Sequence, residues 1–184
     1  MKRFLIIAGV GVAAIALIVW AKNSMDKNQT KALSPEETVS FEDGELQINV
    51  FYNRPYKKGR EIFGDLVSYG KVWRTGANEA TTFQTKTPIT IKGKILKAGK
   101  YSLWTIPNEH SWSIIFNTEY GQWGVNPAGE PNRNPEKDLL TVDVHAAQHE
   151  KEFEQFTIAF EKMGAEAEMI LLWDKTVVVM PFSR

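Results

Sequence analysis

The residues best suited to chemistry lie in a glycine-rich stretch at residues 52–83. Within residues 54–74, six basic side chains are opposed by only two acidic ones, which leaves a net charge of +4. Guanidinium groups form planar, paired hydrogen bonds with carboxylate or phosphate. Together with interleaved aromatic rings, this composition is typical of a surface that binds an anion or a sugar. The candidate ligand-binding residues are Arg54, Arg60, Trp73, Arg74, Asn78 and Glu79.

A structural interpretation of the same arginines is equally open. Arg54 and Arg74 are close enough in sequence to Asp65 and Glu79 to pair with them inside the domain. Such pairs would fix an irregular crossover in the fold and leave no charge for a ligand. The sequence does not choose between the two.

Catalytic chemistry has weaker support. Glu79 is flanked by small residues and is suited to act as a general base, to accept a hydrogen bond from a sugar hydroxyl, or to orient Arg74. No second carboxylate stands out as its partner, so a two-carboxylate glycosidase is not indicated. A hydrolase that uses Glu79 or a histidine is the enzymatic alternative, and no residue is assigned as catalytic.

Two histidines, His145 and His149, have a spacing that would place them on one face of a helix, where they could bind a metal. The glutamate that zinc-protease motifs require between such histidines is absent. The segment also leaves a strand-like pattern, so we expect a solvated turn there, with no metal site. No cofactor-binding motif is present either, and no cofactor is expected.

Composition excludes several classes of protein. The chain has no Cys, which rules out disulfide scaffolds, thiol nucleophiles and Cys-ligated metal sites. The 22 basic and 22 acidic side chains cancel, so the chain is not a nucleic-acid binder that works by bulk positive charge. The neutral total hides a leader at residues 1–33 with a net charge of +4.

The N-terminus carries a run of apolar residues or Gly at residues 4–20, with Lys2 and Arg3 before it. A helix of this length spans about 25 Å, close to the hydrocarbon thickness of a membrane. Residues 1–21 are therefore expected to be a single membrane anchor with the C-terminal domain outside the cytoplasm. The alternative is a signal peptide cleaved near Ala21, which would release the domain into the periplasm. Residues 22–38 are polar, lack periodicity and predict a linker.

Residues 39–184 show short segments in which apolar and polar residues alternate, separated by turn signals such as Asp43-Gly44 and Met163-Gly164. Alternation with period two is typical of strands that have one buried face. We therefore expect a single all-β domain, an antiparallel β-sandwich. Residues 59–70 are expected to form one helical turn, and residues 121–138, rich in Pro and Gly, a long loop of the kind that often carries function.

Several motifs together resemble the bacterial DUF2911 family. They are Asn53-Arg54-Pro55, the run from Tyr69 to Thr81 (YGKVWRTGANEAT), Ala98-Gly99-Lys100-Tyr101-Ser102-Leu103 and Trp173-Asp174-Lys175-Thr176. The resemblance covers roughly residues 36–184. It implies an exported domain with no assigned biochemical activity, and it supplies no catalytic residues.

These observations lead to one functional expectation and two alternatives. We expect a non-catalytic envelope module that binds a small anionic or saccharide ligand through the six candidate residues. The alternatives are the hydrolase and a structural envelope protein whose arginine cluster is paired internally. The expected partners are the membrane, through the N-terminal helix, and that small ligand, with no nucleic acid.

Overall fold

The computed structural model describes residues 16–22, 24–26 and 29–184. The chain divides into two compact units, Met1–Leu33 and Ser34–Arg184. In the first unit, the described residues 16–22, 24–26 and 29–33 are helical. Most of the predicted anchor, residues 1–15, lies outside the described residues. Within the described part of the chain, no helix is both long enough and apolar enough to cross a membrane.

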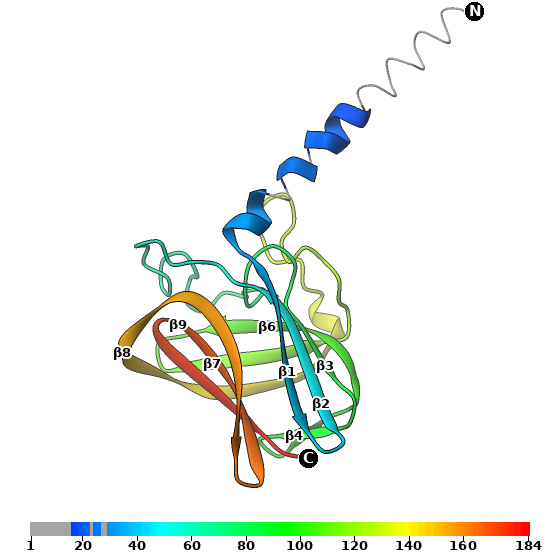
Figure 1. Ribbon diagram of the computed structural model, residues 1–184, viewed down its shortest axis with the longest axis vertical. Helices are drawn as coiled ribbons and strands as arrows, with labels where there is room; N and C mark the ends of the chain where they lie inside the picture. Colours follow the sequence, from blue (N-terminus) through cyan, green and yellow to red (C-terminus); the bar gives the residue numbers. More distant parts are fainter. Residues whose placement is uncertain (1–15, 23, 27–28) are drawn as a thin grey trace, which may run out of the picture. The chain divides into compact units, whose positions relative to one another are not determined.

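The second unit is built from nine strands, all paired antiparallel, and one short 3-10 helix (Figure 1). The antiparallel all-β prediction is therefore confirmed. Strand β1 already begins at Glu36, inside the stretch that the sequence assigned to a linker. The elements are β1 (Glu36–Asp43), β2 (Leu46–Asn53), β3 (Thr82–Thr85), β4 (Ile89–Ile91), β5 (Lys94–Leu96), β6 (Gly99–Pro107), β7 (Ser111–Asn117), η1 (Pro135–Lys137), β8 (Asp138–Met163) and β9 (Glu166–Phe182).

The alternating pattern and the turn residues account for the strands. In β2, Leu46, Ile48 and Val50 are buried while the residues between them are partly exposed. Tight hairpins need positive φ angles at the turn, which glycine adopts at little cost. Gly44 and Gly164 have φ angles of 60° and 65° in the β1–β2 and β8–β9 turns. The predicted turns at both places are confirmed.

Seven strands form one sheet in the order β1-β2-β3-β6-β7-β8-β9, and β4 and β5 form a separate pair. The long β8–β9 hairpin bends where the register of β8 shifts, between Gln148 and Thr157. Opposite this bend, Asp174 of β9 has a φ of 53°. Figure 1 shows β8 arching at the bend and returning across the molecule.

The far half of the hairpin meets the first strand of the sheet. Phe160 of β8 packs on Phe41 of β1 with ring centroids 5.6 Å apart, and Lys162 pairs with Asp43 at 2.6 Å. The sheet therefore curls until its first strand meets the β8–β9 hairpin at its other end. This architecture differs from the two stacked sheets expected for a sandwich, which is not confirmed, because a single bent hairpin covers the core.

The predicted helical turn at residues 59–70 is not formed. The described backbone there consists of turns and isolated bridges, with Val67 N–H bonded to Ile62 C=O at 2.8 Å. Ile62, Phe63 and Val67 are buried in the core, whereas Leu66 is 46% exposed. The segment is too rich in glycine to sustain a helix.

Candidate functional site

Residues 52–57 form the end of β2 and the segment that follows it, and they run alongside the bend of β8. The Lys57 N–H donates to Glu154 C=O at 2.6 Å, and Phe156 N–H donates to Pro55 C=O at 3.0 Å. Tyr56 and Gln155 form an antiparallel bridge between them. The first part of the predicted basic stretch thus holds the bend of the hairpin in place.

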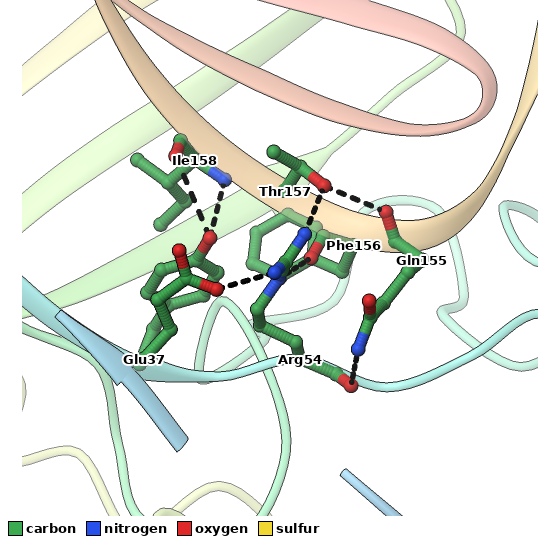
Figure 2. A network of polar contacts seen from close by, with 7 residues as sticks. Glu37, Arg54, Gln155, Phe156, Thr157 and Ile158 are labelled. Atoms are coloured by element: carbon green, nitrogen blue, oxygen red, sulfur yellow. Dashed lines mark hydrogen bonds and ion pairs between the residues drawn. The ribbon is translucent and has the colours of Figure 1, made fainter. Parts of the chain in front are cut away.

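Arg54 is fully engaged with its own domain (Figure 2). Its Nε donates to the Phe156 carbonyl at 3.2 Å, and one terminal nitrogen donates to the Thr157 hydroxyl at 2.9 Å. The other terminal nitrogen forms an ion pair with Glu37 of β1. Arg54 therefore joins β1, β2 and β8, and the internal pairing that the sequence left open is what the structure shows for this residue. Its partner is Glu37 and not Asp65 or Glu79.

Tyr52 makes a second connection to β8. Its hydroxyl accepts a hydrogen bond from the Ile158 N–H at 2.9 Å and donates to the Ile158 carbonyl at 3.4 Å. Burial raises the pKa of Tyr52, and the hydrogen bond to the Ile158 backbone lowers it by less.

We expect Tyr52→Phe to cost about 1–3 kcal/mol, because the buried Ile158 N–H loses its acceptor. The folded state holds the phenol proton more tightly than the unfolded state. The stabilisation is therefore complete below a pH of about 10 and is lost as the pH rises through the raised pKa. Urea unfolding at neutral pH and above pH ~10 measures both effects. Parallel alkaline losses in the wild type and the variant would contradict this assignment.

Two further basic residues of the stretch also bind their own chain. Lys57 forms ion pairs with Asp174 at 2.7 Å and with Glu152 at 3.0 Å, and these bonds, chiefly the one to Asp174, raise the pKa of Lys57. Arg60 is exposed, but its guanidinium donates to the carbonyls of Lys57, at 2.9 Å, and Tyr56. Arg60 thus stabilises its own turn.

Trp73 is partly buried and packs against the hydrophobic core. Its ring packs on Phe156 with centroids 5.1 Å apart and stacks on Trp173 at 5.9 Å with an interplanar angle of 17°. Its indole N–H donates to the Gly76 carbonyl at 3.0 Å. The backbone of Trp73 also bonds to Thr105 of β6 in both directions. The contacts of this ring are therefore with other aromatic side chains of the domain.

Asn78 and Glu79 are tied to the end of β2. Asn78 is 5% exposed, and its Nδ2 donates to Asn53 Oδ1 at 3.2 Å. The Nδ2 of Asn53 in turn donates to Glu79 Oε2 at 3.1 Å. The turn between Arg74 and Glu79 approaches β2 so closely that a Cβ on Gly76 would lie 2.9 Å from the Asn53 carbonyl oxygen. The Asn78-Glu79 pair thus fastens this turn to the sheet.

Arg74 is the candidate that these internal contacts leave out. Its Nε is sealed from solvent and has no hydrogen-bond partner. Within the described residues Arg74 forms no ion pair, although Glu79 lies near enough to act on it electrostatically. Burial lowers the pKa of Arg74 and the Glu79 charge raises it by less. A partly buried guanidinium without an acceptor costs free energy, because its lost hydration is not replaced.

The long loop predicted at residues 121–138 covers the Arg74 side chain. Gly124 has a φ of 93°, and a Cβ there would lie 2.5 Å from Arg74 Cδ. Two residues earlier, the Gln122 carbonyl accepts a hydrogen bond from Ala80 N–H at 3.1 Å. The sequence singled out the loop but not Gln122, whose side-chain Oε1 is also buried without a partner. The glycines that flank Gln122 were the only sequence signal for it.

The histidines lie on a strand, so the predicted turn is wrong, although both side chains are exposed to solvent as expected. His145 and His149 both belong to β8, which continues through this polar segment to Met163. Four residues of extended chain place their Cα atoms about 13 Å apart. Among the described residues, no group of three or more His, Cys, Asp or Glu side chains is placed to hold a metal ion.

The family model for DUF2911, described as a protein of unknown function, matches residues 34–182. The chain belongs to the DUF2911 family. The DUF2911 match covers both the residues that hold the β8 bend and the Arg74 turn. No curated protein and no solved structure matches the chain.

Proposed function

We propose that the DUF2911 domain at residues 34–184 is a non-catalytic module that binds a small anion through Arg74. The observation that carries this proposal is the buried, unpaired Nε of a guanidinium that has no ion-pair partner among the described residues. Buried polar groups in folded proteins nearly always have partners, and an exception calls for a ligand or a water. Carboxylate and phosphate are the groups whose geometry fits a guanidinium.

The saccharide alternative loses most of its support. A sugar site needs an aromatic platform and polar side chains that face it. Trp73 is packed in the aromatic core, and Asn78 and Glu79 are bonded to Asn53. These contacts favour an anion over a neutral sugar.

A purely structural role is the second candidate, and Arg54 is the observation that favours it. Each of its three guanidinium nitrogens donates to a group of the same domain: the Phe156 carbonyl, the Glu37 carboxylate or the Thr157 hydroxyl. If Arg74 has a similar role, its removal will destabilise the domain in the absence of any ligand. The two candidates therefore predict opposite results for one variant.

The test compares Arg74→Met with Arg60→Met in the full chain, by thermal unfolding with inorganic phosphate, acetate or glucose at constant ionic strength. We expect phosphate or acetate, but not glucose, to stabilise the wild type and Arg60→Met. An anion at a hundredfold excess over its dissociation constant contributes about 2.7 kcal/mol. Arg74→Met should lose this gain and, without anion, be as stable as the wild type or more so, because a partly buried charge whose Nε has no acceptor is removed.

Two results would count against the proposal. One is the absence of stabilisation of the wild type by either anion. The other is a loss of stability in Arg74→Met without any ligand, which would favour the structural role.

The place of the module in the cell envelope is a separate proposal. It rests on the apolar run at residues 4–20 and on the basic residues around it. Residues 1–21 would hold the domain at the outer side of a membrane, or would be removed near Ala21 to leave it in the periplasm. Membrane fractionation, with the mass of the mature chain, separates these two outcomes. Recovery of the uncleaved chain in the cytosol would oppose both.

A further inference from the structure

Two further buried polar atoms without a partner lie on the loop that covers Arg74, namely Gln122 Oε1 and Arg133 Nε, and Gln122 is the residue next to the Arg74 turn. Oε1 of Gln122 is sealed from solvent and has no hydrogen-bond donor. The same residue uses its other polar groups: Nε2 donates to the Glu119 carbonyl at 3.2 Å, and its backbone carbonyl accepts from Ala80 N–H at 3.1 Å. Because Nε2 is committed to Glu119, the amide cannot turn over without losing that bond.

The donor and the acceptor belong to neighbouring segments. Thr81 N–H donates to the Arg74 carbonyl at 3.2 Å, and the adjacent Ala80 N–H holds Gln122. The Arg74 turn and the Gln122 loop are thus both held by the backbone of Ala80 and Thr81. Arg74 Nε and Gln122 Oε1 are chemically complementary, yet they do not pair with each other. A group that accepts from one and donates to the other would satisfy both.

We propose that the anion bound at Arg74 carries a hydroxyl beside its charge, as an α-hydroxycarboxylate does. This inference rests on the proposed function. The carboxylate accepts hydrogen bonds from the guanidinium, and the hydroxyl donates to Gln122 Oε1. A simple carboxylate leaves Oε1 without a donor, and an unsatisfied buried acceptor costs affinity.

Access to the two sealed atoms requires the loop to move. Gly121 and Gly124, on either side of Gln122 and Trp123, have φ angles of 94° and 93°. These values lie in a region that glycine adopts readily and other residues do not. In the proposed binding step, this part of the loop moves away from Arg74, and the ligand takes the place of Gly124 against the arginine stem.

The test uses two probes that differ by one hydroxyl, acetate and glycolate, titrated into the full chain by calorimetry. We expect glycolate to bind about tenfold more tightly than acetate, the worth of one hydrogen bond at the upper end of the usual range. Gln122→Met should remove this preference, so that acetate and glycolate bind the variant equally, and Gln122→Asn is a second variant that keeps an amide. Gln84→Met, at an exposed position of β3, is the matched control and should keep the preference.

The outcomes separate this inference from the proposed function. Equal binding of acetate and glycolate, both lost in Arg74→Met, overturns the hydroxyl assignment and leaves the anion site intact. A glycolate preference that survives in both Gln122 variants also overturns it. If neither probe binds the wild type, or if both bind Arg74→Met as they bind the wild type, the anion site is overturned and this inference with it.

Discussion

Replacing Trp73 by Ala is expected to lower the free energy of unfolding by about 3 kcal/mol, the lower end of the usual cost of deleting a large aromatic side chain from a core, because Trp73 is partly buried. The ring contacts four others, from Phe63, Trp112, Phe156 and Trp173, with centroids 5.1 to 6.1 Å apart. These rings come from the loop after β2 and from β7, β8 and β9. The substitution therefore removes a contact that four distant segments share.

Urea unfolding followed by near-ultraviolet circular dichroism measures the loss for Trp73→Ala. Trp73→Phe keeps a ring in the cluster and should lose less. Tyr120→Ala, at an aromatic residue that is 51% exposed, should stay within about 1 kcal/mol of the wild type. A Trp73→Ala variant as stable as the wild type would contradict the packing role given to this ring.

Replacing Arg54 by Ala should cost about 2 kcal/mol. Removing one partner from a buried ion pair costs more, but the Arg54 and Glu37 side chains are 23% and 41% exposed, and solvent screens part of the interaction. The Phe156 carbonyl and the Thr157 hydroxyl lose their donor in the same step. We expect the bend of β8 to loosen, because Arg54 joins it to β1.

Chemical denaturation of Arg54→Ala, Glu37→Gln and the double variant gives the coupling energy of the pair directly. Hydrogen exchange at residues 154–158 reports the bend itself. Arg60→Ala is the matched control, since that guanidinium bonds only to carbonyls of its own turn. Additive losses from Arg54 and Glu37 would contradict the proposed link between β1 and β8.

The strands could be predicted from the sequence wherever one face is buried throughout. Leu46, Ile48 and Val50 alternate with polar residues, and glycines mark the turns, because both requirements are local. The pattern fails at residues 149–155 of β8, where the register shifts and the regular alternation of buried residues stops. A bulged strand obeys no simple period, so this segment looked like a turn and the bend that replaces the second sheet of a sandwich was missed.

The sequence by itself determined the all-β antiparallel class, the hairpin turns and the family, because these depend on residues near one another along the chain. It also marked residues 52–83 as unusual. Only the tertiary structure separated Arg54 from Arg74. Arg54 donates hydrogen bonds to acceptors at Phe156 and Thr157, about a hundred positions away along the chain. Arg74 lies under a loop, and its Nε has no acceptor there. Local composition is alike around both arginines, and a guanidinium is structural or free to bind according to which distant oxygen atoms the fold brings to it.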